Sequence, residues 1–159
     1  MWNKSLTSSP PRIKGRSSVW SLNERFYQEI AVRVAKPAEP IGEFPPNMVP
    51  SGLVLGYSIA RGLYIPYDDS AVDGNVALGV IPQELWFYPE DGTGEESMSA
   101  MIVMGVLRED EMVGLDSAAK RDLWCPHEGR AILFPTQDFT GHQWHLDVER
   151  RARRYEHGA

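Results

Sequence analysis

Three aspartates lie close together in the middle of the chain and raise the possibility of a metal loop or an acid–base site. Residues 62–81 read GLYIPYDDSAVDGNVALGVI, in which Asp68, Asp69 and Asp73 are followed by Gly74. Carboxylates grouped in this way bind calcium when their spacing supplies a full set of ligands. They perform general acid–base catalysis when two of them are held in a cleft with separated pKa values.

Neither chemistry fits the spacing. With Asp69 as the first calcium ligand, the third position of the loop falls on Ala71 and the twelfth on Val80, where carboxylates are required. Nothing else in the sequence indicates a cleft that would hold a pair of catalytic carboxylates. Asp-Gly permits positive φ, and aspartate side chains cap local backbone amides, so we interpret the segment as a structural turn. Its residues are Pro66, Asp68, Asp69, Asp73 and Gly74.

A second group combines thiol and imidazole side chains. Cys125 and His127 lie near each other, and His142 and His145 follow beyond a short apolar strand. Zinc requires four ligands at workable spacing, and only folding could bring these two pairs together. We therefore expect surface or interface histidines, with no metal and no cofactor. Cys125 precedes a proline and lies beside no motif of a catalytic nucleophile.

The motifs that cradle phosphates or activate a serine are missing from the sequence: GxxxxGK[ST], GxGxxG and GxSxG do not occur. The C-terminal run ERRARRYEHGA contains Arg150 and Arg151 and has the composition of a segment that binds nucleic acid or an acidic protein surface. Terminal arginines more often form a solvated tail or pair with a neighbouring acidic body, which is the interpretation adopted here. No enzymatic activity is predicted.

The apolar pattern that must position these residues is mainly that of β-strands. Alternation of Ile30, Val32 and Val34 with Ala31, Arg33 and Ala35 predicts a half-buried strand. Further strands are predicted within 51–59, 62–67, 75–82, 98–107 and 130–134. The segment 108–123 has acids early, cations late and a break at Gly114, which predicts one short helix. The expected fold is a small β-barrel or β-sandwich-like body.

The chain of 159 residues suits one domain with extensions at both ends. We divide it into a basic, proline-rich N-terminal arm and linker (1–46), a β-rich body (47–134) and a C-terminal extension (135–159). Four prolines between residues 36 and 46 predict an extended connector. A single cysteine excludes an intrachain disulfide, and no apolar run reaches the roughly 20 residues needed to span a bilayer. We expect a soluble protein made in a reducing compartment, without a membrane partner.

Charge is segregated along the chain. Residues 1–40 hold seven Lys or Arg and three Glu, whereas residues 41–128 hold four basic and fifteen acidic side chains. Such an acidic body argues against direct nucleic-acid binding, because phosphate binding needs many cations on one face. A basic arm on an acidic body is typical of a segment that reaches a partner.

Large aromatic residues occur in the proline-punctuated end segments. Residues of this kind often act as anchors that become buried on a partner. Packing of Trp20 and Trp144 back onto the chain's own body is the open alternative. The candidate anchors are Trp2, Trp20, Phe26 and Tyr27 in the arm, and Trp144 and Tyr155 in the tail.

The segment SGLVLGYSIARGLYIPYDDSAVDGNVALGVI resembles the head decoration proteins of tailed phages. The shared residues include GLVL from Gly52, PYD from Pro66, the Asp73-Gly74 pair and GVI from Gly79. Further on, AMIVMGVLREDEMVGLD is similar to the family's apolar strand followed by a short helix that begins with acids. The resemblance covers about residues 45–123.

The resemblance implies a small, mainly β protein of the virion, made in the host cytoplasm, that trimerises on the outer surface of an expanded capsid. Such trimers clamp adjacent major capsid subunits, and neighbouring trimers are possible further contacts. It also implies an arm that orders on the capsid, often by adding a strand to capsid protein. Here the segment EIAVRVA is the best candidate for strand addition, to capsid protein or to its own body. The candidate contact residues are therefore Trp2, Trp20, Phe26, Tyr27, Ile30, Val32 and Val34 in the arm, with Trp144, Arg150, Arg151 and Tyr155 in the tail.

The sequence thus predicts a non-enzymatic capsid decoration protein. Two alternatives remain open: another virion component, such as a head–tail connector or tail protein, and a small metal-dependent enzyme. The role of residues 135–159, which extend past the region of resemblance, is not predicted.

Overall fold

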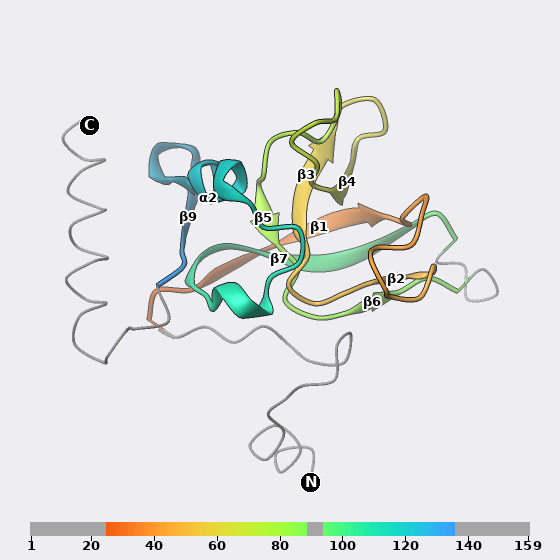
Figure 1. Ribbon diagram of the computed structural model, residues 1–159, viewed down its shortest axis with the longest axis horizontal. Coiled ribbons are helices and arrows are strands. Elements are labelled where there is room, and N and C mark those ends of the chain that lie inside the picture. The colour runs from red at the N-terminus through yellow and green to blue at the C-terminus, as the bar shows by residue number, and fades with distance from the viewer. Residues whose placement is uncertain (1–24, 89–93, 136–159) are drawn as a thin grey trace, which may run out of the picture.

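The structure of the protein is a computed structural model in which residues 25–88 and 94–135 are described. In these two stretches strands predominate, and α2 (Ser117–Leu123) is the single α-helix (Figure 1). The predicted fold class, a mainly β body with one short helix, is confirmed. No helix in the described part of the chain is long and apolar enough to cross a membrane.

Closure of the sheet into a small barrel depends on its first strand. β1 (Gln28–Ala35) pairs antiparallel with β7 (Glu96–Val106) along its whole length and parallel with β4 (Leu63–Pro66) at Val34. The sheet continues from β4 through β3 (Val54–Ser58) and β5 (Gly79–Val80) back to β7. Because β1 bonds to both ends of this series, the ring β1-β4-β3-β5-β7 is closed.

The end of the long strand β7 carries a second group of strands. β9 (Arg130–Leu133) runs parallel to the last residues of β7, and β8 (Trp124–Cys125) pairs antiparallel with β9. A separate two-stranded sheet joins β2 (Met48–Val49) to β6 (Leu85–Trp86). β7 is therefore the strand to which the closed ring and the C-terminal strands are both attached (Figure 1).

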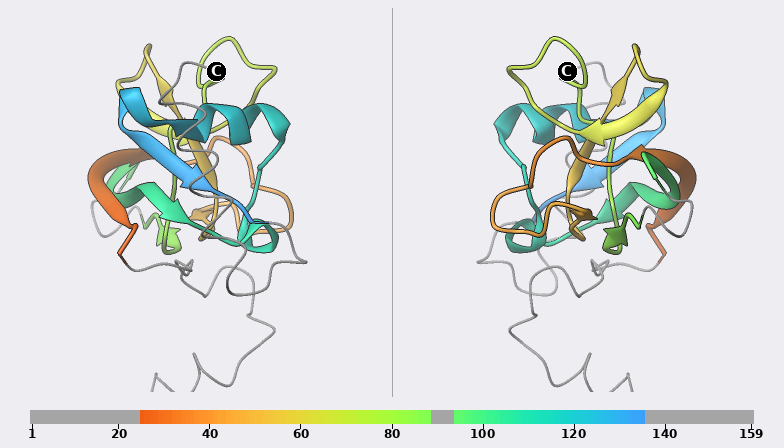
Figure 2. Two further views of the ribbon diagram at one scale, coloured as in Figure 1. Left: turned by 90° about the vertical axis from the view of Figure 1, so that its left-hand side faces the viewer. Right: turned by 90° about the vertical axis from the view of Figure 1, so that its right-hand side faces the viewer.

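The segment between β7 and β8 folds as the sequence predicts, with a break at Gly114. A short 3₁₀ turn, η2 (Glu109–Glu111), comes first, Gly114 has a φ of 77°, and α2 follows. Asp116 caps the helix, since its side chain accepts a hydrogen bond from Ala119 N at 2.7 Å. Lys120 and Arg121 lie in the last turn, where cations favour the helix dipole. α2 lies beside β9 in both views of Figure 2.

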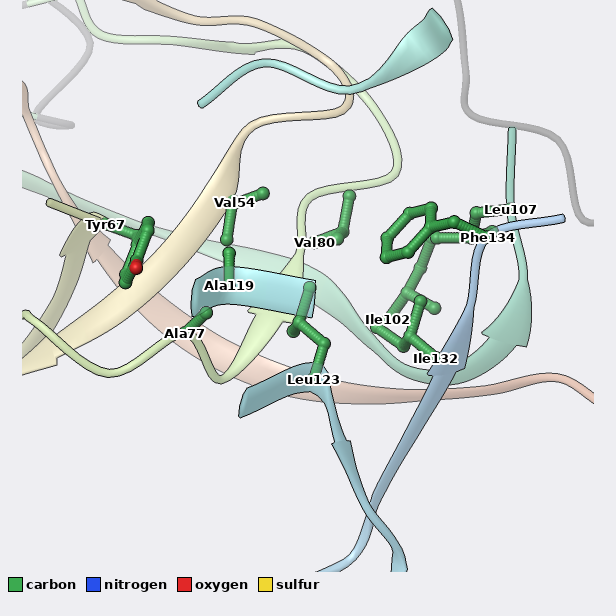
Figure 3. Close-up of a cluster of buried hydrophobic side chains, with 10 residues drawn as sticks. All are labelled: Val54, Tyr67, Ala77, Val80, Ile102, Leu107, Ala119, Leu123, Ile132 and Phe134. Carbon is green, nitrogen blue, oxygen red and sulfur yellow. The ribbon is translucent and has the colours of Figure 1, made fainter. Parts of the chain in front are cut away.

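Buried apolar side chains hold this helix against the barrel. Ala119 and Leu123 of α2 meet Val54 of β3 and Ile132 of β9 in one cluster (Figure 3). Fully burying one side chain of the size of Leu123, Val54 or Ile132 stabilises the fold by about 1.5–3 kcal/mol. A second cluster fills the space between β1, β3 and β7; its members are Val32, Val34, Val49, Leu53, Leu55, Ile81, Phe87, Met101 and Val103.

Most of the predicted strands form within the expected ranges. β3 lies within the predicted range 51–59, β4 within 62–67 and β9 within 130–134, and β7 lies close to 98–107. β3 and β4 form the hairpin that their spacing indicates. Of the predicted strand 75–82 only Gly79–Val80 is a strand. β2, β6 and β8 were not predicted, because two residues are too short for a periodic pattern.

Candidate functional site

The aspartate loop connects β4 to β5, and each of two carboxylates serves the backbone. Asp68 accepts hydrogen bonds from Ser70 N at 2.9 Å and from Ser70 Oγ at 2.7 Å, which closes an Asx turn. These bonds, the hydroxyl first, hold the pKa of Asp68 below its ordinary value. Asp69 is exposed, and Pro66 ends β4. The loop therefore has the local bonding of a structural turn.

Asp73 joins this loop to the neighbouring hairpin. Its Oδ2 accepts a hydrogen bond from Ser58 Oγ at 2.5 Å, and its Oδ1 accepts one from Ile59 N at 3.0 Å. The Ser58 hydroxyl, and then the Ile59 amide, lower the pKa of Asp73. Gly74 follows with a φ of 76°, in the left-handed region that favours glycine. The turn 59–62 and the loop 68–76 consequently lie together at one end of the barrel (Figure 1).

The joined turns present apolar side chains to solvent. Ile59, Val72 and Val76 are 86%, 100% and 45% exposed. Val72 and Val76 lie on either side of Asp73 in the sequence, and the backbone N–H of Ile59 donates a hydrogen bond to the Asp73 carboxylate. This end of the barrel therefore exposes apolar side chains on two turns that the hydrogen bonds of Asp73 hold together.

A second connection ties the same loop to α2. The hydroxyl of Tyr67 donates a hydrogen bond to Asp116 Oδ1 at 3.2 Å, and burial together with the Asp116 carboxylate raises the pKa of this tyrosine. A groove borders the pair, between the connector 36–41 and the loop. Cations and carboxylates both line it: Lys36 and Arg61 with Glu39, Asp68, Asp69 and Asp116.

The structure corrects the expectation for two residues of the predicted arm. Val32 and Val34 are 4% and 0% exposed and belong to the second core cluster, so they cannot serve as partner contacts. EIAVRVA adds its strand to the chain's own body, which is one of the two pairings left open by the sequence. The predicted boundary at residue 46 therefore lies after a strand that belongs to the sheet.

The other described residues of the predicted arm lie on or near the barrel. Phe26 is half-buried against Trp124, Ala131 and Leu133, and Tyr27 packs against the cluster of Figure 3. Ile30 of β1 is 39% exposed and keeps an accessible apolar face. The remaining candidates lie outside the described residues: Trp2, Trp20, Trp144, Arg150, Arg151 and Tyr155.

One group of metal-ligating side chains comes together where β8 turns into β9. Cys125 Sγ lies 3.5 Å from His127 Nε2, and ligand atoms of Cys125, His127 and Glu128 all lie within 4.8 Å of one another. Burial, and then the Glu128 carboxylate, raise the pKa of the Cys125 thiol, which makes it a poor nucleophile. Sequence reasoning grouped Cys125 with His127, His142 and His145 and did not name Glu128, because the strand β8 that forms one side of the turn is too short to be read from the sequence. His142 and His145 lie outside the described residues.

No model of a known protein family matches the chain, and no curated protein matches it.

Proposed function

We propose that this chain is a capsid decoration protein that binds as trimers to the outside of an expanded phage head. In this role the β-rich body clamps adjacent major capsid subunits, and the N-terminal segment reaches across the shell. The proposal rests on the resemblance of about residues 45–123 to the head decoration family, whose shared motifs keep their order and spacing along the chain.

The observation that carries the proposal is the position of the shared residues in the fold. A side chain at Gly52 would place its Cβ 2.1 Å from the backbone oxygen of Glu111, and one at Gly79 would lie 2.7 Å from that of Ile102. Gly74 combines a positive φ with close contact to Ile65. Contacts this short exclude a Cβ unless the backbone shifts, so these glycines are demanded by the packing of the barrel. A resemblance at such residues supports a common fold, and the role itself is proposed from the resemblance to the head decoration family.

Charge supports the same role. The described residues hold eight Lys or Arg and fifteen Asp or Glu, whereas residues 1–24 hold four Lys or Arg and one Glu. A basic segment on an acidic body favours contacts between the segment of one copy and a neighbouring surface. Three segments in one trimer act together, so that weak single contacts sum to durable attachment.

Co-sedimentation with capsid shells tests the proposal. The chain is mixed with compact and with expanded shells assembled from the major capsid protein encoded in the same genome. We expect saturable binding to expanded shells only, with density for three copies at each three-fold position in electron cryomicroscopy. Failure to bind either shell, or assembly of the free protein into six-fold or twelve-fold rings, would contradict the proposal. Rings would favour the head–tail connector.

The N-terminal segment is tested in the same assay. A variant lacking residues 1–24 keeps every described strand. We expect it to remain folded and to lose at least tenfold in affinity for expanded shells, because its anchors Trp2 and Trp20 are removed. Binding equal to that of the full chain would show that the body alone carries attachment. The exposed variant Met98→Ser is the control and should bind normally.

A further inference from the structure

The turn between β8 and β9 places three different metal-ligating groups within four residues. Cys125 supplies a thiol, His127 an imidazole and Glu128 a carboxylate, and their ligand atoms lie within 4.8 Å of one another. These are the three ligand types that zinc takes from proteins, whereas calcium and magnesium take oxygen ligands only. The composition of the group therefore selects a thiophilic divalent cation.

The distance between the sulfur and the imidazole agrees with this selection. Zinc binds sulfur at about 2.3 Å and nitrogen at about 2.0–2.1 Å in tetrahedral geometry, so two such ligands lie roughly 3.6 Å apart. Cys125 Sγ and His127 Nε2 are 3.5 Å apart, and Cys125 Sγ lies 3.9 Å from His127 Nδ1. The sulfur therefore faces the imidazole ring, and the exposed His127 side chain must turn for Nε2 to point at an ion bound to the sulfur.

The backbone of the turn is fixed on both sides of these ligands. Cys125 pairs with Arg130 across β8 and β9, and Gly129, with a φ of 82°, donates its N–H to Pro126 O at 3.1 Å. These bonds close the turn around the 3₁₀ helix η3 (Pro126–Glu128), which carries two of the ligands. A turn that is closed before the ion arrives loses little entropy on binding it.

Arg130 orients the third ligand. Its Nη2 donates to Glu128 Oε2 at 2.7 Å, while its Nε donates to the backbone oxygen of Asp122 at 2.9 Å. Arg130 thus holds the carboxylate beside Cys125, whose thiol hydrogen-bonds to it. Hydrogen bonds of this kind from outside the ligand set commonly orient metal ligands.

We propose that Cys125, His127 and Glu128 bind one zinc ion in the turn between β8 and β9. Three protein ligands leave the fourth tetrahedral position to water or to another side chain. The proposal is independent of the proposed function, because metal binding is measured on the isolated protein without capsid shells.

Titration of the reduced, chelator-treated full-length protein with cobalt tests the site. Cobalt occupies tetrahedral zinc sites and gives a thiolate charge-transfer absorption when sulfur is a ligand. We expect this absorption to saturate at one cobalt per chain and to disappear on addition of one equivalent of zinc. Absence of saturable absorption, together with absence of zinc binding by calorimetry, would overturn the proposal.

Single substitutions assign the ligands. Cys125→Ser should abolish the charge-transfer absorption, and His127→Gln should weaken zinc binding at least tenfold. Glu128→Gln should also weaken it at least tenfold, because the amide is a much poorer zinc ligand than the carboxylate. All three positions are at the surface or half-buried, so the variants should fold, which circular dichroism verifies. Asp69→Asn, on another loop, is the control and should bind zinc as the unmodified chain does.

Two of the three tail histidines provide the decisive comparison. The double variant His142→Gln/His145→Gln leaves the three proposed ligands in place, and we expect its zinc affinity to stay within threefold of that of the unmodified chain. Loss of binding in this variant, with normal binding in His127→Gln, would place the ion elsewhere and overturn the assignment.

Discussion

Asp73 accepts a hydrogen bond from the hydroxyl of Ser58, and this 2.5 Å contact joins the β3–β4 hairpin to the loop that leads into β5. Ser58 is fully buried, and its Oγ also accepts a hydrogen bond from Arg61 N at 3.1 Å. A buried hydroxyl that both donates and accepts has its bonding needs met. The contact therefore fixes two turns whose exposed residues form one end of the barrel.

Removing the hydroxyl should destabilise the protein measurably. Ser58→Ala deprives Arg61 N of its acceptor and Asp73 of a donor, and we expect a loss of about 1–2 kcal/mol in the free energy of unfolding. Urea denaturation followed by tryptophan fluorescence measures it. Asp69→Asn, an exposed change in the same loop, should stay within about 0.5 kcal/mol. Equal effects of the two changes would argue against a stabilising role for the Ser58–Asp73 hydrogen bond.

The hydrogen bond between Ser58 and Asp73 should weaken in acid. The pKa of Asp73 is lower in the folded protein, chiefly because of the Ser58 hydroxyl, than the roughly 3.9 of an unfolded chain. Its contribution to stability is therefore present above about pH 4 and is lost as the pH falls through the folded pKa. Asp73→Asn should be less stable than the unmodified protein at pH 7, with the difference shrinking towards pH 2.5. A difference that stays constant from pH 7 to 2.5 would contradict this role.

Gly74 should tolerate substitution less well than a glycine of similar conformation in open space. Gly74 and Gly114 have φ values of 76° and 77°, so alanine at either position costs about 1–2 kcal/mol in the left-handed region. A Cβ at Gly74 would also lie 2.6 Å from Ile65 Cδ1, whereas at Gly114 nothing lies within 4 Å. We expect Gly74→Ala to destabilise the protein by about 1 kcal/mol more than Gly114→Ala.

Thermal unfolding of the two alanine variants measures this difference. Ile65→Val, which removes the methyl group nearest to the new Cβ, should recover part of the loss in the Gly74→Ala background. Equal losses at the two glycines would show that Ile65 moves aside without cost.

Local patterns predicted the strands, but not all of their partners. The alternation of Ile30, Val32 and Val34 is readable in the sequence and gives β1, yet its pairing with β7 joins residues more than sixty positions apart. Alternation indicates only that one face is buried, and an arm that pairs with another protein has the same pattern. The assignment of Val32 and Val34 to a partner was wrong for this reason.

The candidate sites show the same limit. That the aspartates serve the backbone was predictable, because Asp-Gly and Asp-x-Ser have local turn chemistry. The Ser58 partner of Asp73 was not, since it lies on the neighbouring hairpin. The group around Cys125 required the turn between β8 and β9, and β8 is too short to have a readable pattern.

Truncations should separate the end of the arm from the first strand of the barrel. Deleting residues 1–24 leaves β1 intact, and we expect an unfolding midpoint close to that of the full chain. Deleting residues 1–36 removes Val32 and Val34 from the core and exposes the edges of β4 and β7. That protein should unfold without cooperativity or aggregate, because open edges and exposed apolar surface favour both. Calorimetry of the two proteins checks this, and a cooperative transition in the shorter one would show that β1 is dispensable.

Tyr67 and Asp116 should be energetically coupled, because one carboxylate both caps α2 and accepts the tyrosine hydroxyl. Tyr67→Phe removes one buried hydrogen bond and should cost about 0.5–1.5 kcal/mol. Asp116→Ala should cost more, because it also removes the helix cap, which alone contributes about 0.5–2 kcal/mol.

The double variant tests whether the two residues share one interaction. The double variant should lose less free energy of unfolding than the sum of the losses in the two single variants. The difference should be about 0.5–1.5 kcal/mol, which is the contribution of the shared hydrogen bond. Asp116→Asn keeps a good capping side chain and should cost little. Asp110→Ala breaks an exposed ion pair with Arg108 and should stay within about 0.5 kcal/mol. Strict additivity in urea denaturation would mean that the Tyr67–Asp116 bond does not help to hold α2 against the barrel, which would leave the apolar contacts of Leu123 and Ala119 and the hydrogen bond from Ala77 N to Asp122 to test next.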